Sequence, residues 1–340
     1  MNKITLQENE IGDIESLLKA ITERYESVED SGFLSEAAIF AHDLPRRLRA
    51  RILEFRQKEP ASGLLVIAGY PLDDGVIGPT PKSWDYQRTR TKTLREEIYL
   101  VLIGFLLGEP IAWATQQGGY LVHDILPIQG REHEQIGFSS EEPLWWHTED
   151  AFHPFRGDYL AMFCLRNPDN VATTVGSFAG IELEAWCREL LFQPRYFIRP
   201  DESHLLANSP KERGLDRELQ QVYDQMDEWF CAPPRVSVLF GARDAPYMRL
   251  DPYFMGGLEK DPEAARALSA MSTAMEANLQ DVVIHPGEVC VIDNYQAVHG
   301  RRSFRARYDG NDRWLKRINV ARDLRRSREV RSDAESRVIR

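Results

Sequence analysis

The stretch LWWHTEDAFHPFRGDYLAMFCLRNPDNVATTVGS (residues 144–177) contains three short apolar runs separated by turn-forming residues. The runs cover residues 144–151, 159–165 and 172–177, and Gly, Pro, Asn and Asp fill the gaps between them. Short runs of this kind, rich in aromatic and β-branched residues, are typical of strands in a barrel or a sandwich. The stretch therefore predicts a core that is mainly β.

The same pattern continues on both sides of this stretch. Further strands are predicted at residues 111–115, 120–128, 195–198, 235–240, 247–250, 282–284, 289–293 and 315–320. Helical insertions are predicted near residues 181–192 and 262–279, where apolar residues recur at helical spacing. A jelly roll is the simplest architecture for such a series, because its two packed sheets shield each other and leave a pocket between them.

Helical periodicity dominates the chain before this β-rich region. It predicts helices at residues 10–27, 44–57 and 92–107, a short helix or a loop at 33–41, and one buried strand at 62–71. The charge-dense tail is expected to be a solvated strand end or a disordered extension. We therefore predict a single domain over residues 1–340, with a helical buttress and the first strand at 1–109, a jelly-roll core at 110–326 and a polar tail at 327–340.

Composition excludes several classes of protein. The chain has 340 residues, of which 43% are apolar and 28% charged, as in an ordinary globular protein. The formal net charge of -11 argues against a nucleic-acid binder. No apolar stretch is long enough to span a membrane, and the N-terminus lacks the apolar segment of a secretion signal. Four scattered cysteines predict free thiols and a cytoplasmic protein: Cys164, Cys187, Cys231 and Cys290.

The segment LWWHTEDAFH (residues 144–153) also carries the strongest chemical signal. Residues i and i+2 of a strand point to the same face, so His147 and Glu149 can converge on one ion. A second imidazole is available at His299, after the strand at 287–293. Two histidines and one carboxylate form the facial triad of non-haem iron(II) oxygenases, which leaves positions open for cosubstrate and oxygen.

The metal assignment has competitors. An HxE pair alone is weak, since many strands contain one by chance. His153 has no carboxylate two residues before or after it. Catalytic zinc also uses two histidines and a glutamate, but the usual HExxH helix motif is absent. The sequence beyond His299 therefore decides between these possibilities.

An arginine-rich segment, GRRSFRARYDGNDRWLKRINVARDLRRSR (residues 300–328), follows His299. A strand in this segment would place a guanidinium inside the barrel near the metal. A dicarboxylate cosubstrate that binds iron through one end needs a bidentate cation at the other end, and arginine supplies this better than lysine. Spacing alone does not choose among these arginines.

Four motif groups together carry a resemblance: WHTEDAFH (146–153), DY (158–159) with LRNPD (165–169), ATT (172–174), and HGR (299–301) with RYDGNDRWLKR (307–317). They resemble the clavaminate synthase-like branch of 2-oxoglutarate oxygenases, which includes arginine and lysine β/γ-hydroxylases. The similarity runs from about residue 60 to residue 326. It implies a double-stranded β-helix, an iron(II) ion on His147, Glu149 and His299, and 2-oxoglutarate and O2 as cosubstrates.

The resemblance also implies roles for individual residues that bind the cosubstrate and the substrate carboxylate. The arginine that clamps 2-oxoglutarate in this branch stands fourteen residues after the distal histidine, which is Arg313 here. Arg317 matches a position that holds the carboxylate of an amino-acid substrate. A threonine hydrogen-bonds 2-oxoglutarate in relatives, and Thr174 is the candidate here, with Thr173 as the next choice.

The substrate implied by the resemblance is a free L-amino acid or a molecule derived from one, as in antibiotic biosynthesis. Gln116 and Gln117 match positions that contact the α-amino group, and Glu149 can accept from the same amine. Asp251 matches an acid that binds the distal cation, but Tyr253 stands where arginine hydroxylases often have a second aspartate. One carboxylate favours an ammonium. We therefore predict hydroxylation of a basic amino acid at C3 or C4, with lysine slightly ahead of arginine.

Three alternatives stay open from the sequence. The same machinery can desaturate or cyclise an amino-acid-derived intermediate. A non-catalytic jelly-roll binding module or a zinc hydrolase would belong to another class. The polar, Gly- and Ser-containing loop at 130–142 is predicted to be a lid. No nucleic-acid or membrane partner is expected, and the sequence does not specify an oligomeric state.

Overall fold

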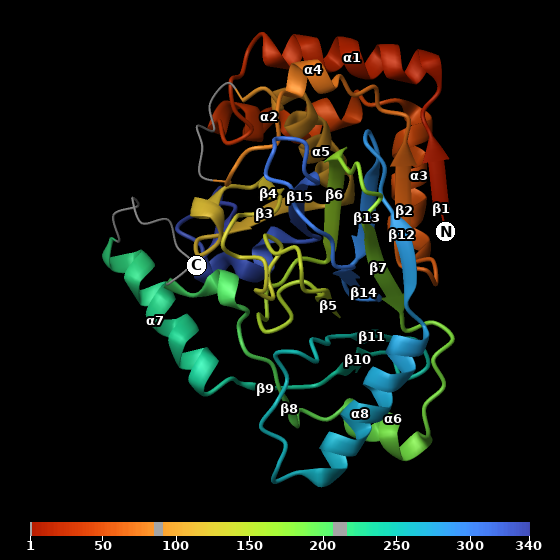
Figure 1. The fold of residues 1–340 in the computed structure, drawn as a ribbon, viewed down its shortest axis with the longest axis vertical. Coiled ribbons are helices and arrows are strands. Elements are labelled where there is room, and N and C mark those ends of the chain that lie inside the picture. Colours follow the sequence, from red (N-terminus) through yellow and green to blue (C-terminus); the bar gives the residue numbers. More distant parts are fainter. Residues whose placement is uncertain (1, 85–90, 207–215) are drawn as a thin grey trace.

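Two β-sheets form the centre of the molecule, and helices flank them (Figure 1). The computed structural model describes residues 2–84, 91–206 and 216–340. The larger sheet contains β1 (Asn2–Thr5), β2 (Leu64–Ala68), β3 (Glu109–Trp113), β4 (His123–Ile125), β6 (Tyr159–Arg166), β13 (Val289–Asp293), β15 (Trp314–Ala321) and β16 (Val338–Ile339). Its strand order is β1-β2-β13-β6-β15-β3-β16, and β4 pairs with β15. The smaller sheet contains β5 (Leu144–His147), β7 (Ala172–Ser177), β12 (Gln280–Val283) and β14 (Ala297–Arg301), in the order β12-β7-β14-β5.

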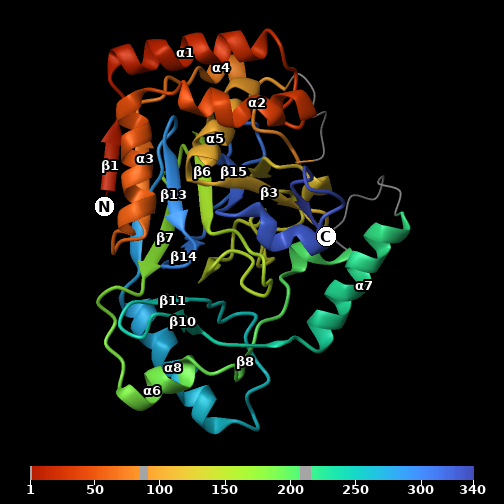
Figure 2. The same ribbon diagram turned by 180° about the vertical axis from the view of Figure 1, so that it is seen from behind.

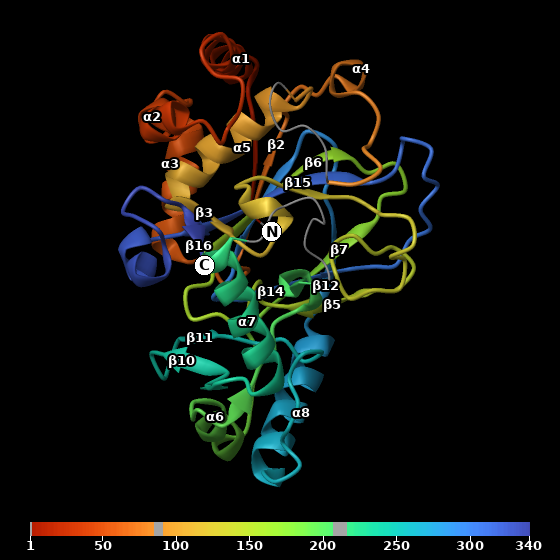
Figure 3. The same cartoon turned by 90° about the vertical axis from the view of Figure 1, so that its left-hand side faces the viewer.

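The N-terminal helices cover the outer face of the larger sheet (Figure 3). They are α1 (Glu8–Thr22), α2 (Ser31–His42), α3 (Arg46–Lys58), α4 (Asp74–Ile77) and α5 (Leu94–Leu107). Helix α5 packs against α1, α2 and α3 on one side and against β15 and β6 on the other. A helix enclosed in this way is apolar nearly all round, which explains the run IYLVLIGFLL at residues 98–107.

Strand β6 separates two layers of the core. Alternate residues of a strand point to opposite faces, so Phe163 packs beneath the helices while Met162 faces the smaller sheet. All eight residues of β6 are buried. This is why the strand forms a continuous apolar run instead of an alternating pattern.

A further group of elements lies on the far side of the smaller sheet from these helices (Figures 1 and 2). It contains α6 (Ala185–Leu191), β8 (Tyr196–Phe197), β9 (Arg235–Val236), β10 (Leu239–Gly241), β11 (Pro246–Met248) and α8 (Pro262–Ala277). Helix α7 (Arg217–Cys231) lies at the side of the molecule, where Leu219 and Tyr223 pack with Ala114 (Figure 1). Helices α6 and α8 pack together, and their apolar faces share a core with residues near β5. The predicted helical insertions therefore form one lobe beside the sheets.

Most predicted helices and strands are present with shifted ends, but several predictions were wrong or incomplete. Helix α7 and strand β1 were not predicted. Strand β5 ends at His147 and does not continue to residue 151. Much of the tail is exposed, but its end is not: β16 pairs with β3, and Ile339 is buried against it. The short apolar pair Val338–Ile339 extends the sheet past β3, which a charge-based prediction overlooked.

Two predictions about the whole chain can be compared with the structure. The four cysteines are free, and three of them are buried: Cys164, Cys187 and Cys290. Among the described residues, no helix combines the length and the apolar character that a bilayer crossing requires.

Candidate active site

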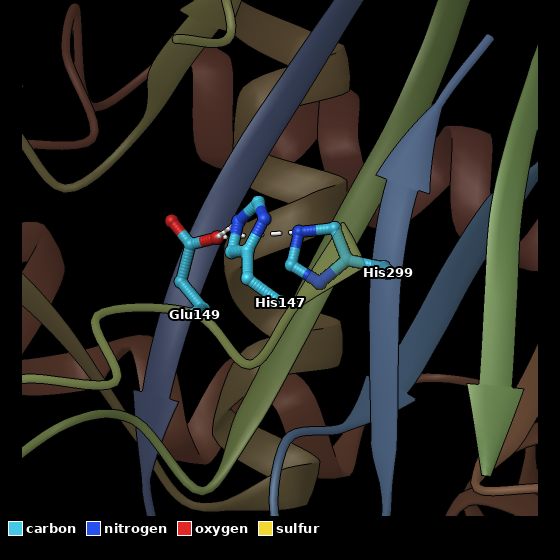
Figure 4. Close-up of side chains that lie close together, drawn as sticks. All are labelled: His147, Glu149 and His299. Carbon is cyan, nitrogen blue, oxygen red and sulfur yellow. Dashed lines mark ion pairs between the residues drawn. The ribbon is translucent and has the colours of Figure 1, made fainter. Parts of the chain in front are cut away.

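Three side chains converge between the two sheets (Figure 4). The antiparallel ladder of β14 and β5 places His299 directly opposite His147, and their ring centroids are 4.6 Å apart. Glu149 Oε2 lies 3.6 Å from His147 Nε2 and 3.2 Å from His299 Nε2. One ligand atom from each residue lies within 4.8 Å of the others. The structure thus brings together the three predicted metal ligands.

Glu149 lies in the turn just after β5, and other segments hold it in place. The Asn294 side chain accepts a hydrogen bond from the Glu149 N–H (2.7 Å) and donates to the Glu149 carbonyl (3.0 Å). The Thr148 N–H donates to the Leu250 carbonyl (2.8 Å). The carboxylate is therefore oriented by the fold itself.

The histidines are also oriented. His147 Nδ1 lies 2.7 Å from the Trp145 carbonyl, so a proton on Nδ1 leaves the Nε2 lone pair facing Glu149. This arrangement is common for metal-binding histidines, because the outer hydrogen bond fixes both the tautomer and the ring.

Charges around Glu149 keep it ionised. Burial opposes the charged carboxylate, but the Arg317 guanidinium and the two histidines hold its pKa well below the usual value. Arg317 Nη1 forms an ion pair with Glu149 Oε1, which leaves Oε2 facing the imidazoles. Burial also opposes protonation of His147, yet Glu149 and Asp251 raise its pKa to about 9. The ionised Glu149 carboxylate therefore faces both imidazoles at the point where the three ligand atoms meet.

Arg313 lies in the same pocket and has no anionic partner among the described residues. Its side chain is nearly fully buried, and burial lowers its pKa to about 10. Its Nε has no hydrogen-bond partner in this part of the chain, and Nη2 lies 3.5 Å from Thr173 Oγ1. A buried guanidinium with unused donors fits the carboxylate of a ligand.

The structure favours Thr173, the second choice of threonine, over Thr174. Thr173 lines the pocket with Arg313, whereas Thr174 pairs with Gly300 and points to the opposite face of β7. Neighbouring residues of a strand face opposite sides, so a one-residue error in alignment selects a side chain that points away from the pocket.

The predicted substrate-binding residues all line the pocket. Arg317 Nη2 donates to Gln116 Oε1 (3.4 Å), and Gln116 Nε2 donates to Ser203 Oγ (2.6 Å). The Gln117 amide instead bonds the Asp124 backbone, donating at 2.8 Å and accepting at 3.0 Å. Gln117 is therefore tied to the scaffold, and Gln116 has the amide closest to the Arg317 guanidinium.

Asp251 lies in the pocket near His147, and burial raises its pKa to about 6. A nearby carboxylate, Asp201, was not predicted from the sequence. It lines the same pocket, and its charge contributes to the raised pKa of Asp251. Asp201 lies in an irregular segment before η2 (Glu202–His204), where no sequence periodicity marks it.

A second cluster of possible ligands, Asp150, Asp201 and His204, forms a hydrogen-bonded network. Trp113 Nε1 donates to Asp150 Oδ2 (2.6 Å), and His204 Nε2 lies 3.0 Å from Asp150 Oδ1. Thr115 Oγ1 lies 2.7 Å from His204 Nδ1. Because both ring nitrogens of His204 and both carboxylate oxygens of Asp150 have partners, we assign these two residues a structural role. They hold the turn at Asp150, whose backbone has φ 49°.

The loop at residues 130–142 also reaches the pocket. Residues 135–138 line it, and Phe138 packs near Trp84 with ring centroids 6.4 Å apart. This position agrees with the predicted lid.

The residues present fit an iron(II) ion and a dicarboxylate. Two imidazoles and one carboxylate on one side of the site are the donor set of non-haem iron oxygenases. The unpaired Arg313 suits the remote carboxylate of a cosubstrate bound beside them.

Comparisons with known proteins agree with this geometry, although no family model matches the chain. The chain is 46% identical to an enduracididine beta-hydroxylase of Streptomyces hygroscopicus and 41% identical to an L-ornithine/L-arginine 3-hydroxylase of Catenulispora acidiphila, over 100% of each protein in both cases. It is 29% identical to clavaminate synthase 2 of Streptomyces clavuligerus, over 86% of this chain and 84% of that protein.

Solved structures give the same result. The non-heme iron oxygenase OrfP in complex with Fe, succinate and (3S)-hydroxy-L-Arg has a TM-score of 0.94 and 41% identity over 100% of both chains. The complex of OrfP with Fe and alpha-ketoglutaric acid has a TM-score of 0.89 and 41% identity, over 99% of this chain and 100% of that one.

Proposed function

Because the chain belongs to the clavaminate synthase-like family of iron(II)- and 2-oxoglutarate-dependent oxygenases, we propose that it hydroxylates C3 of a free L-amino acid with a guanidino side chain. The protein is an amino-acid hydroxylase that uses iron(II), 2-oxoglutarate and O2. One observation carries the proposal: the three ligand atoms and the unpaired Arg313 lie in one pocket with two carboxylates, Asp201 and Asp251.

His147, Glu149 and His299 would hold the iron, and Arg313 with Thr173 would bind the remote carboxylate of 2-oxoglutarate. When bound, the iron supplies the oxidative decarboxylation of 2-oxoglutarate to succinate and CO2, which is coupled to attack on an unactivated carbon. The protein contributes the position of each reactant, since only a carbon held close to the metal is oxidised.

The substrate's amino-acid end would lie against Arg317 and Gln116. Arg317 has a fork of donors that suits a carboxylate, and it contacts both Glu149 and Gln116. Gln116 and the second oxygen of Glu149 would accept from the α-amino group. These contacts fix the α-carbon beside the metal ligands and thereby bring C3 within reach.

The distal cation would lie between Asp251 and Asp201. Asp251 alone favoured an ammonium, and hence lysine. Asp201 comes from a different segment and adds a second carboxylate to the same pocket. Two carboxylates suit the planar fork of a guanidinium better than the compact charge of an ammonium. We therefore place arginine and related guanidino amino acids ahead of lysine.

We also infer that the two sheets form the double-stranded β-helix expected from the resemblance. Residues of both sheets line the pocket: Met162 of β6 and Arg317 of β15 face His299 of β14 and Thr173 of β7. A pocket enclosed by two sheets and covered by a loop excludes bulk water from the reaction.

A panel of free amino acids tests the proposal. L-citrulline is the matched control for L-arginine, since it has a nearly identical shape but carries no distal charge. We expect L-arginine to give one succinate per product heavier by one oxygen atom, and citrulline to react at least about tenfold more slowly, because a buried carboxylate pair would lose its cation. A product lighter by two hydrogens would indicate desaturation. Turnover of neutral or acidic amino acids alone would refute the proposal.

Variants locate the distal site. Asp201→Asn and Asp251→Asn should each raise KM for L-arginine by about tenfold or more, with a smaller effect on kcat, because they remove one charge-assisted contact far from the metal. Asp244→Asn, at an exposed position, is the control and should match the unchanged enzyme. Equal kinetics for all three variants would place the distal cation elsewhere.

A further inference from the structure

Arg301 lies in β14, two residues beyond His299, and holds the loop at residues 130–142. Its side chain is 4% exposed. Nη2 donates to Ser139 Oγ (2.8 Å) and to the Glu142 carbonyl (3.1 Å), and Nη1 donates to the Ser140 carbonyl (3.1 Å). One buried guanidinium therefore connects a metal-binding strand to the end of the loop that covers the pocket.

The segment after Arg301 adds two more attachments. The Phe304 N–H donates to the Ser140 carbonyl (2.8 Å), and Tyr308 Oη donates to Glu132 Oε1 (2.8 Å). The Glu132 carbonyl in turn accepts from the N–H groups of Ser140 (3.2 Å) and Glu141 (3.0 Å). The loop is thus attached to the stretch between the distal histidine and Arg313.

The charge of Arg301 is not balanced by a carboxylate in the described part of the chain. Its hydrogen-bond acceptors there are neutral oxygens, and its Nε has none. Arg301 and Arg313 both line the pocket. Arg301 lies opposite Thr173 in the ladder of β14 and β7, and Arg313 Nη2 is 3.5 Å from Thr173 Oγ1. Burial and the charge of Arg313 both lower the pKa of Arg301. Two like charges are therefore buried near each other, and their repulsion opposes the conformation that holds the loop.

We propose that Arg301 is a positioning residue that couples binding of the dicarboxylate cosubstrate to closure of the loop at 130–142. The inference rests on the proposed function. A carboxylate on Arg313 neutralises the charge that repels Arg301, so Arg301 stays in place and its three contacts hold the loop against the pocket. Without the anion the repulsion is unscreened and the loop is held less tightly. The pocket therefore closes when the cosubstrate is bound.

The experiment uses N-oxalylglycine, an unreactive analogue of 2-oxoglutarate, with Mn(II) in place of iron. Amide hydrogen exchange of residues 130–142 reports loop closure, and titration calorimetry reports affinity for the analogue. Both are measured without turnover. The variants are Arg301→Gln, which removes the charge and most donors, and Arg301→Lys, which keeps the charge but loses the fork. Arg302→Gln is the matched control, because Arg302 is exposed and pairs with Asp281 (2.9 Å).

In the unchanged protein and in Arg302→Gln, we expect the analogue to slow amide exchange in the loop by about tenfold. This factor corresponds to the free energy of one or two charge-assisted hydrogen bonds. Arg301→Gln should lose this protection, and its Kd for the analogue should change by less than about threefold, because loop contacts and repulsion of Arg313 offset each other. Arg301→Lys, which is the variant less prone to misfolding, should also lose the protection while exchange in α1 stays unchanged.

Equal protection of the loop in Arg301→Gln, Arg301→Lys and the unchanged protein would overturn this inference alone. Failure of the unchanged protein to bind the analogue would overturn the proposed function, and this inference with it. A general loss of protection that includes α1 in Arg301→Lys would show a merely structural role and would also overturn the inference.

Discussion

Two buried cations lie close together in the sequence, Lys316 in β15 and Arg313 directly before it, and their surroundings differ. On the helix side, Lys316 Nζ is 2.9 Å from Glu97 and 2.8 Å from Asp124. Trp314 Nε1 donates to Asp124 (2.6 Å), and Thr93 Oγ1 donates to Glu97 (2.8 Å). On the pocket side, Arg313 has no anionic partner among the described residues.

The difference indicates what each cation does. A buried charge that is paired within the protein needs no ligand to compensate it, whereas an unpaired buried cation costs folding free energy. The Lys316 cluster is complete without a ligand, so it holds α5, β4 and β15 together. Arg313 has no carboxylate partner among the described residues, so we expect an anion from solution to pair with it. The presence or absence of carboxylate partners thus distinguishes a scaffold cation from a ligand-binding one, although the two residues are only three positions apart.

The largest effect is expected from breaking the metal site itself. His147→Ala should abolish iron binding and lower succinate formation by at least about 100-fold, because a direct ligand is lost. Its melting temperature without metal should stay close to that of the unchanged protein. His42→Ala, on the exposed end of α2, is the control. Iron content after desalting and succinate release measure the outcome, and retained iron would contradict the ligand assignment.

Breaking the complete cluster should cost stability instead. Lys316→Ala removes the cation that lies between two buried carboxylates, so we expect a loss of about 3–5 kcal/mol in unfolding free energy. Lys58→Ala removes an exposed ion pair with Glu54 and should cost less than about 1 kcal/mol. Denaturant titration measures both. Similar losses for the two variants would mean that the buried cluster does not stabilise the scaffold.

Removing the unpaired cation Arg313 should weaken cosubstrate binding without lowering the unfolding free energy. Arg313→Met should raise KM for 2-oxoglutarate by about tenfold or more, because the carboxylate loses a charged partner. The unfolding free energy without ligand should not fall, and a gain of about 1 kcal/mol is expected from removing a desolvated charge. A stability loss as large as that of Lys316→Ala would show that the two buried cations do not differ in this way.

The smallest effect is expected from a comparison of two adjacent residues in β7. Thr173→Ala should raise KM for 2-oxoglutarate by about two- to fivefold, because one neutral hydrogen bond is lost. Thr174→Ala should leave KM unchanged, because Thr174 lies on the other face of β7. Steady-state kinetics at varied 2-oxoglutarate measure both, and the reverse order would restore the choice made from the sequence.

The sequence was sufficient for the β-rich class and for the residues that meet at the metal. Strand β6 was predicted because burial on both faces leaves an apolar run, and His147 and Glu149 because their spacing is local. Helix α7 was missed although its buried residues Leu219, Val222, Tyr223 and Met226 follow helical spacing.

Other features depend on contacts between distant segments, which composition and spacing do not encode. The ladder that pairs His299 with His147 is set by the register of β14 and β5. Asp201 reaches the pocket from an irregular segment, so no local pattern identified it. Thr173 and Thr174 are adjacent in the sequence, and only the observed strand register tells which of them faces the pocket.

The Asn294 side chain forms hydrogen bonds with the backbone of Glu149, which lies 145 positions earlier in the sequence. During synthesis on the ribosome, the first two ligands emerge long before the residue that orients one of them and before His299. The centre cannot assemble until most of the polypeptide has been made. We therefore expect iron to bind after synthesis and folding are complete, because a nascent chain that lacks His299 has an incomplete set of ligands.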